Sequence, residues 1–514
     1  MNYLSNVIRF LFCLGFFSGT ALVVAAQSIS QPHRIEIEDE DSNPIEVLPL
    51  PDSTFLIYKR PYFSFKKEHS FQKYSKDFKL VWSQKVELEN RLEFYQFFPG
   101  PDFVYALYKH SNSSEFSILK IDPKTGTNIL NSYNLRQHDI KYEVDLESFQ
   151  ILENHIFITA KSSVNSFVIH LDEINNELKT IPALYGPLNT LVDFHLDTLT
   201  RRAEFILAES KSNIGRLQVK RFNSQGNLFT SNFIRPVERQ SLITAKISPG
   251  DSTRKVIIGA YSLRDSRFAQ GLFSTTLNNL ETIRYYDFIQ LKHFFDFMRK
   301  KSRERLFTKA QKYAAKNKTF RQQYQLLIHD AIWHGEKLYL VGEVYNQRST
   351  TYRSLYNYRS SAILARARWR PDLLENAYRT NPGYNRNYKY SHSLVCVFDK
   401  DGNYLWDNSL VIKDVEDDEL IPVSQFGFYQ DKTIMAYAYE KEIRYKIVNQ
   451  DSTSEEALVE PLRTNAPDEK ITSADNTTLL HWYGPHFIAF GYHYIRSPRS
   501  SNKRIFFINK VSFK

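Results

Sequence analysis

Short runs of apolar residues recur along most of this chain, and each run ends near a polar turn. Eight of them have the length and the β-branched and aromatic content of buried strands. In chain order they are Phe55–Arg60, Phe103–Lys109, Ile156–Ser162, Phe205–Ser210, Val256–Ser262, Leu338–Tyr345, Ile434–Glu440 and Phe487–Tyr494. The pattern predicts an all-β protein.

The eight runs begin at a nearly constant spacing. Most successive starts are 48 to 53 residues apart, but two gaps measure 82 and 96 residues. The first long gap contains the segment 292–323, in which Phe294 and Met298 stand four residues apart and which we expect to form a helix or helical hairpin. The second contains an irregular segment rich in Tyr and Arg, 347–392. When these 32 and 46 residues are set aside, both gaps shrink to 50. The chain therefore has a repeat unit of about fifty residues and two inserts.

Each unit continues from its buried strand to a second strand, a polar turn and a further strand. The turns include Asp122–Gly126, Asn223–Gly226 and Asp399–Gly402. Asp, Asn and Gly suit such turns because they tolerate positive φ and hydrogen-bond to their own backbone. A four-stranded unit of this length is typical of a β-propeller blade. We expect an eight-bladed β-propeller over residues 31–514, with seven or nine blades as alternatives.

The last unit has three strands before Lys514, while the segment His33–Glu38 is a strand without a local partner. We expect this N-terminal strand to complete the last blade, which would close the ring and remove an exposed sheet edge.

Two of the turns carry a family resemblance. Ile121–Gly126 and Phe398–Trp406 are similar to the blade-closing turn of quinoprotein-type and WD40-like propeller repeats. The second stretch, continued to Ser409, also resembles a family of uncharacterised exported proteins of Bacteroidota. This resemblance implies a propeller and export, and it carries over no catalytic residue. The adjacent cysteines of quinoprotein dehydrogenases are absent, so we expect no cofactor.

Residues 1–26 have the pattern of a signal peptide. Arg9 precedes a seventeen-residue apolar run, and Val24–Ala26 fits a small-residue cleavage site before Gln27. An uncleaved anchor is the alternative, but the run is short for a membrane-spanning helix. We expect export to the periplasm, the cell surface or the medium. Cleavage would leave Cys396 as the single cysteine, a core thiol without a disulfide partner.

Charge is distributed unevenly along the chain. The formal net charge is +10, yet 292–323 holds eleven Lys and Arg against two acidic residues, and 347–392 holds nine against two. The remainder of the chain beyond the signal peptide carries −7. Two strongly basic inserts therefore emerge from a mildly acidic propeller.

The guanidinium group of arginine forms paired hydrogen bonds to phosphate, sulfate or carboxylate groups, and aromatic rings stack on sugar faces or bases. The inserts sit next to and within the same blade, so we expect them to form one basic aromatic platform. The candidate binding residues are Arg299, Lys300, Lys301, Arg303, Arg305, Tyr352, Arg353, Tyr356, Arg366, Arg368 and Trp369. A solvated helix and a Tyr-rich loop paired with acidic blades would give the same pattern.

No motif in the sequence indicates catalysis or metal binding. His329, Asp330, His334 and Glu343 lack a recognised ligand spacing and are interpreted as polar positions at blade ends. Asp399–Asn403 resembles the start of a calcium loop, but Val411 occupies the position of the bidentate Glu, so a hairpin turn is expected.

The sequence thus favours a non-catalytic binding or scaffolding protein of the cell envelope or surface. The expected partner is an anionic glycan, a membrane surface or an acidic protein, and nucleic acid is not expected. The alternative is a glycan-active enzyme with its site in the central channel. The oligomeric state is left open.

Overall fold

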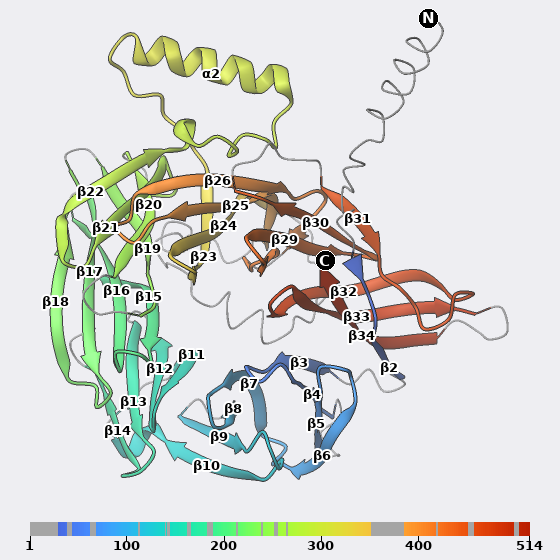
Figure 1. Cartoon of the computed structure of the whole chain (residues 1–514). Coiled ribbons are helices and arrows are strands. Elements are labelled where there is room, and N and C mark those ends of the chain that lie inside the picture. The colour runs from blue at the N-terminus through green and yellow to red at the C-terminus, as the bar shows by residue number, and fades with distance from the viewer. Residues whose placement is uncertain are drawn as a thin grey trace, which may run out of the picture.

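The computed structural model describes most of the chain after the predicted signal peptide. It covers residues 29–38, 44–61, 68–110, 114–138, 140, 144–161, 166–181, 189–211, 214–237, 240–250, 255–263, 266–350, 385–417, 420–450, 457–497 and 503–513. The fold is an eight-bladed β-propeller, in which eight antiparallel sheets stand around a common centre (Figure 1).

Each blade contains four main strands, with the first strand innermost. Blades one and two comprise β3 Ile45–Pro49, β4 Phe55–Lys59, β5 Glu68–Tyr74 and β6 Leu80–Glu87, then β7 Leu92–Pro99, β8 Val104–His110, β9 Glu115–Ile121 and β10 Asn128–Asn134, which the 3-10 helix η1 Leu135–His138 follows. Blades three and four comprise β11 Asp145–Leu152, β12 His155–Lys161, β13 Ser166–Asp172 and β14 Glu177–Thr180, then β15 Asn189–Asp197, β16 Arg202–Lys211, β17 Ile214–Asn223 and β18 Leu228–Ile234.

The second half of the ring repeats this arrangement. Blades five and six comprise β19 Ser241–Ile247, β20 Val256–Ser262, β21 Gly271–Thr276 and β22 Asn279–Asp287, then β23 Gln325–His334, β24 Lys337–Thr350, β25 Asn385–Phe398 and β26 Tyr404–Val411, with the short β27 Glu416–Asp417 beside β25. Blades seven and eight comprise β28 Gln425–Tyr429, β29 Lys432–Tyr439, β30 Glu442–Val448 and β31 Leu458–Pro461, then β32 Lys470–Tyr483, β33 His486–Arg496 and β34 Lys503–Phe513.

The eight predicted buried runs are confirmed as the second strands of the eight blades. The predicted closure is confirmed as well, because β2 Arg34–Glu38 pairs with β34 from Arg34–Asn509 to Glu38–Ile505. A shorter strand ahead of it, β1 Ile29–Ser30, pairs with the end of β34 at Phe513. The blue N-terminal strand lies against the red C-terminal blade in Figure 1. The last blade is thus built from both ends of the chain.

The hydrophobic core is divided among the seams between blades. The buried apolar side chains of the described residues form eight clusters, and each cluster combines side chains of two neighbouring blades. At the first seam, the buried Tyr58 and Tyr108 place their hydroxyl oxygens 3.1 Å apart, and His69 Nδ1 lies 2.7 Å from the Tyr58 oxygen. A single blade could not bury both of its faces, so the blades stabilise one another as a ring.

The polar turns between third and fourth strands link neighbouring blades. A side chain on the third strand of one blade reaches the turn of the next blade at several seams. These contacts are Lys73 Nζ to the Pro123 carbonyl at 2.8 Å, Lys120 Nζ to Glu173 at 3.2 Å, His170 Nε2 to the Ser224 carbonyl at 2.9 Å and Ser274 Oγ to the Gly402 carbonyl at 2.6 Å. The turns that mark the repeat in the sequence are therefore also contact points between blades.

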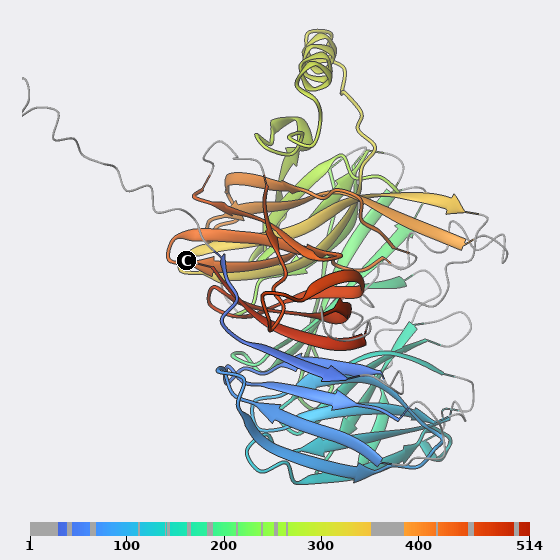
Figure 2. The same ribbon diagram turned by 90° about the vertical axis from the view of Figure 1, so that its right-hand side faces the viewer.

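One α-helix stands outside the ring. Within 292–323, where a helix or helical hairpin is predicted, the structure has a single helix, α2 Lys300–Ala314. Both views show it beyond the rim of the propeller, near blades five and six (Figures 1 and 2). No helix among the described residues is long and apolar enough to cross a membrane.

Candidate functional site

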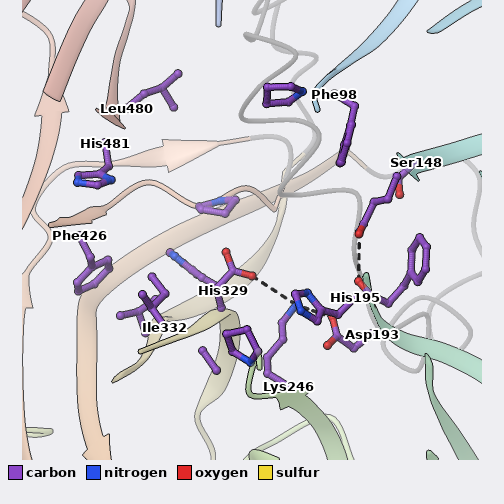
Figure 3. Close-up of a pocket in the computed structure, with 18 of the residues that line it drawn as sticks. Phe98, Ser148, Asp193, His195, Lys246, His329, Ile332, Phe426, Leu480 and His481 are labelled. Carbon is purple, nitrogen blue, oxygen red and sulfur yellow. Dashed lines mark hydrogen bonds and ion pairs between the residues drawn. The ribbon is translucent and has the colours of Figure 1, made fainter. Parts of the chain in front are cut away.

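A cavity of about 690 Å³ occupies the centre of the ring, and residues from the innermost strands of all eight blades line it. Its wall combines apolar and aromatic side chains with polar ones, and Figure 3 shows part of this lining in close-up. Pockets of this size and lining are typical of sites for small ligands. We call this cavity the central channel.

A recurrent β-bulge shapes the wall of the channel. The register of the innermost strand shifts by one residue just before Gln96, Ser148, Asp193 and Thr244 in blades two to five. In blade six the shift is larger and takes in His329 and Asp330. Bulges re-aim side chains, and they are common next to functional sites. Three of the first four residues, all but Thr244, belong to the channel lining.

Lys246, on β19, is held between two carboxylates in the channel. Its Nζ lies 2.6 Å from Asp193 Oδ1 and 4.0 Å from Asp330 Oδ1. Burial acts to lower the pKa of Lys246, but the attraction of Asp193 and Asp330 outweighs it and raises the pKa above the usual value. The lysine therefore stays protonated at neutral pH and neutralises one of the two carboxylates.

Glu343, on β24, is buried behind the channel wall and fixes the neighbouring blade. Its carboxylate accepts hydrogen bonds from the backbone N–H groups of Val423 and Ser424, at 2.9 Å and 2.5 Å, and from the Ser424 hydroxyl at 2.6 Å. His329 Nε2 lies 3.5 Å from the same carboxylate. This glutamate is thus a structural acceptor between blades six and seven.

Some polar atoms in the channel wall have no hydrogen-bond partner among the described residues. Gln96 is 5% exposed, and its Oε1 is unpaired. The buried Nε2 of His195 is unpaired as well. Gln150 differs from them, since its amide donates to the Phe194 carbonyl and accepts from Leu196 N–H, which ties β11 to β15. Gln96 and His195 therefore keep hydrogen-bonding capacity that the fold does not use.

The stem that carries α2 is firmly anchored to the outer strand of blade six. The N–H groups of Lys292 and His293 each donate to the buried carboxylate of Asp407, at 2.8 Å. The Ser409 hydroxyl donates to the His293 carbonyl at 2.8 Å. Beside them, Phe294 is fully buried. The chain is therefore ordered before the helix begins.

The two ends of the insert are also fastened to each other. Asp287, the last residue of β22, accepts from the side-chain amides of Gln270 and Gln322, each at 2.6 Å. It also caps the 3-10 helix η3 Phe288–Gln290 through the N–H of Ile289. Burial raises the pKa of Asp287 in spite of these hydrogen bonds. The departing and returning segments thus share one buried carboxylate.

The helix α2 itself is mostly exposed, and four of its six cations gather on one side. Lys301, Arg305, Lys309 and Lys312 line a shallow hollow on its surface, together with Glu304 and Thr308. Ala310 is the only buried residue of the helix. The partly buried Leu306 and Phe307 lie on the other side and pack towards the core. We call Lys301, Arg305, Lys309 and Lys312 the cationic stripe.

The sequence-predicted binding residues divide between described and undescribed parts of the chain. Arg299 is the N-cap residue of α2, Lys300, Lys301 and Arg305 project from its first turns, and Arg303 pairs with Asp296 in the stem. The remaining six, Tyr352, Arg353, Tyr356, Arg366, Arg368 and Trp369, lie outside the described residues. The common platform of both inserts therefore stays a prediction.

The two inserts do meet blade six at the same end of its sheet. Gln325, where the chain returns from the helical insert, pairs with Tyr345, and its side chain accepts from Gln347 N–H at 3.0 Å. From there β24 and β25 continue as a hairpin to the pair Thr350–Asn385. The ends of the predicted segment 347–392 are thus strand residues.

The structure also shows the positions of the predicted hairpin turn, the predicted core cysteine and the histidines considered as metal ligands. Asp399–Asn403 forms a hairpin turn, in which Asp399 accepts from the N–H groups of Asp401 and Asn403. Cys396 is fully buried, and burial raises the pKa of its thiol. His334 stacks on Phe428, 4.1 Å between ring centres, away from the channel residues His329 and Asp330. Among the described residues, no group of three or more His, Cys, Asp or Glu side chains is arranged to hold a metal ion.

Sequence reasoning did not find the channel residues Gln96, Asp193, His195 and Lys246. They are spread over blades two to five and look like ordinary polar positions in strands. The sequence does contain one signal for such a residue, a break in the alternation of apolar and polar residues along the strand. Asp193 follows the apolar pair Leu191 and Val192 at the position of the bulge.

Neither family models nor curated protein sequences match this chain. Solved structures with similar folds include an uncharacterised protein from Listeria monocytogenes, at 8% identity and a TM-score of 0.38, covering 92% of this chain and 100% of that one. Polysaccharide lyase Uly1 matches at 10% identity and 0.38, over 94% and 99% of the two chains. A quinoprotein alcohol dehydrogenase-like protein from Bacteroides thetaiotaomicron matches at 11% and 0.33, over 72% and 66%. Similarities this distant carry no argument about activity.

Proposed function

We propose that this protein is a non-catalytic binding propeller of the cell envelope or surface, and that α2 presents its cationic stripe to an anionic polysaccharide. The proposal rests mainly on one observation. The exposed cationic helix α2 is joined to the propeller by a stem that hydrogen bonds and buried side chains hold in place. Little of α2 is buried, so the core does not need it.

The charge arrangement of α2 is unfavourable for the helix alone. Lys301, Arg305 and Lys309 follow one another at intervals of four residues, and like charges at this spacing destabilise a helix by a few tenths of a kcal/mol per pair. No ion pair of the described residues involves Lys301, Arg305 or Lys312. A polyanion bound along the stripe would turn this repulsion into attraction.

The geometry favours an extended anionic chain over a membrane surface. From Lys301 to Lys312 the stripe extends about 16 Å along the helix, at 1.5 Å per residue. A helix that lies in a membrane interface buries its apolar face in lipid. Here the apolar side, with Leu306 and Phe307, packs towards the protein. The side left free is cationic.

The location in the envelope rests on sequence alone. Residues 1–26 lie outside the described part of the chain, and the resemblance of Phe398–Ser409 to exported Bacteroidota proteins stays a prediction. N-terminal sequencing of the protein recovered from its native cells tests this step. A mature chain that starts at Gln27 is expected, and a full-length cytoplasmic chain would contradict export.

Binding to immobilised heparin tests the stripe. The test variant replaces Lys301, Arg305, Lys309 and Lys312 by Gln, and the control variant replaces the exposed Lys79, Lys124, Lys400 and Lys470, on other parts of the ring, by Gln. We expect the wild type and the control to be retained to similar salt concentrations. The stripe variant should elute earlier, with an affinity at least about tenfold lower near 0.1 M salt, where screening acts beyond about 10 Å.

Equal elution of the two variants would show that net charge alone governs retention and would overturn the proposal. Vesicles of phosphatidylcholine with phosphatidylglycerol are the second probe. Binding to these vesicles without retention on heparin would replace the polysaccharide by a membrane surface.

A glycan-active enzyme remains the second candidate, favoured by two carboxylates, Asp193 and Asp330, in the channel. Both of them lie next to Lys246, and the described lining contains neither Tyr nor Arg. Incubation with neutral and anionic polysaccharides, followed by reducing-end analysis, tests it. Product release that an Asp330→Asn variant loses would favour the enzyme.

A further inference from the structure

The central channel differs in chemistry from the cationic helix. Its mouth and wall contain aromatic and apolar side chains, such as Phe98, Phe426 and Ile332, among the polar groups (Figure 3). Its charges are one lysine and two carboxylates, with the buried Glu343 behind them. A site with this balance repels anions, so it does not serve the ligand proposed for α2.

The unpaired atoms indicate what the channel lacks. A buried polar atom without a partner costs about 1–3 kcal/mol, and native proteins keep few of them. Gln96 Oε1 and His195 Nε2 are two such atoms of residues in the channel lining, one from blade two and one from blade four. An uncharged ligand with several hydroxyl groups can both donate to an amide oxygen and accept from, or donate to, an imidazole nitrogen.

The remaining polar groups offer further capacity. The Asp330 side chain is 58% exposed, and its contact with Lys246 is a long one at 4.0 Å. Its carboxylate is therefore free to accept further hydrogen bonds from a ligand. Asp193 is by contrast close to Lys246 and largely buried, so it holds the lysine in place.

The aromatic side chains have fixed orientations. Trp333 Nε1 donates to the Pro249 carbonyl at 2.9 Å, which sets the plane of the indole at the channel wall. His329 lies against Phe426, with ring centres 6.2 Å apart at 80°. The negative face of an aromatic ring attracts weakly positive C–H groups, which line the faces of sugar rings.

From the cavity, its unpaired polar atoms and its charge balance, we infer that the central channel binds a small neutral carbohydrate of one or two sugar rings. The volume of about 690 Å³ lies within the 300–1,000 Å³ that is usual for small-ligand sites. This inference is independent of the cationic stripe, which lies outside the ring on α2. It requires no chemical step.

Saturation-transfer NMR tests the inference, with glucose, galactose, mannose, N-acetylglucosamine, maltose, cellobiose and lactose as probes. We expect transfer to at least one of them by the wild-type protein, followed by a titration of its affinity. Gln96→Leu and His195→Phe remove the two unpaired groups, and each should weaken binding about tenfold, since 1.4 kcal/mol corresponds to that factor.

The matched control is His155→Phe, a histidine on β12 that is not part of the channel lining. It should bind like the wild type. Thermal melting of all variants shows that each one folds, and His195→Phe should not lower the midpoint, because it removes an unpaired buried atom. The stripe variant should bind the neutral sugars normally.

Failure of every neutral probe to bind would overturn the inference. So would binding that neither channel variant weakens, or preferential binding of glucuronic acid or glucosamine, which would assign a charged ligand to the site. Loss of heparin retention with intact sugar binding would leave the channel assignment standing, so the two proposals fail separately.

Discussion

Lys255 and the lysines of the cationic stripe occupy contrasting environments. Lys255 is fully buried at the seam between blades four and five, where its Nζ lies 2.5 Å from Asp197 and 2.8 Å from Glu204. The lysines of the cationic stripe project from α2 into solvent. Buried cations must be paired, because an unpaired charge in the interior is strongly unfavourable. The two buried ion pairs explain why the fold needs a lysine at position 255. No ion pair of the described residues explains a lysine at position 301 or 312.

The largest expected effect comes from breaking the buried pair. Lys255→Met would leave the carboxylates of Asp197 and Glu204 in the interior without their shared cation, although Arg221 still contacts Glu204 at 2.9 Å. We expect a loss of about 3–5 kcal/mol in the free energy of unfolding. Urea unfolding followed by tryptophan fluorescence measures it. A loss below about 1 kcal/mol would mean that the seam does not depend on the pair.

The second-largest effect is expected from acid, which should destabilise the buried stem that carries α2. His392, fully buried against Phe294 and Phe297, has a pKa lowered by burial to about 3, with Asp296 acting in the opposite direction. The unfolded chain has an ordinary pKa near 6.5 and takes up the proton first, so this stability is complete above pH 6.5 and is lost as the pH falls towards 3. Near pH 4.5 the loss should be about 2–3 kcal/mol.

His392→Phe keeps a ring at this position and removes the titrating group. The difference in stability between pH 7 and pH 4.5 should therefore shrink by about 2 kcal/mol, as measured by unfolding at both values. His33→Phe, on a partly exposed ring, serves as the control. An unchanged pH dependence in His392→Phe would show that other groups govern the acid response.

The anchor of the stem is expected to give an intermediate effect. Asp407→Asn retains the shape of the side chain but removes the charge that receives the N–H groups of Lys292 and His293. Hydrogen bonds to charged groups contribute about 1.5–3 kcal/mol, and part of this should be lost. Faster hydrogen exchange at 292–298 and faster proteolysis within α2 are the measurements. Ser409→Ala, which removes one neutral hydrogen bond, should have a smaller effect.

The smallest change in stability should follow from neutralising the cationic stripe. Replacing Lys301, Arg305, Lys309 and Lys312 by Gln relieves repulsion along α2 and should alter the free energy of unfolding by less than about 0.5 kcal/mol. Heparin affinity should fall in the same variant. A large destabilisation would place these residues with Lys255, as structural cations, and would remove the contrast between the two sites.

The architecture could be derived from the sequence because each blade repeats the same local signals. Apolar runs such as Val256–Ser262 alternate with turns such as Asp399–Gly402, and the structure places both where the period requires them. The closing strand was predictable because Arg34–Glu38 had no local partner and the last unit lacked one strand. Local patterns decide these features, so a single sequence contains them.

The central channel could not be derived in this way. Gln96, Asp193 and Lys246 belong to three different blades, and only the closed ring brings them to a common cavity. Bulges displace some of them from the strict alternation that reveals a strand's buried face. The helical segment shows the same limit, because Phe294 sits at helical spacing from Met298 yet belongs to the buried stem that precedes α2.

The pairing of β2 with β34 has a consequence for how the protein is made. At a synthesis rate of 5–20 residues per second, a ribosome needs about 23–93 s to advance from Glu38 to Lys503. During that time β2 exists without β34, so neither the last blade nor the ring can be completed, wherever the chain then folds. Ring closure is therefore a final, long-range event, and the edges of the open ring are the surfaces that a folding helper would have to protect until the chain is released.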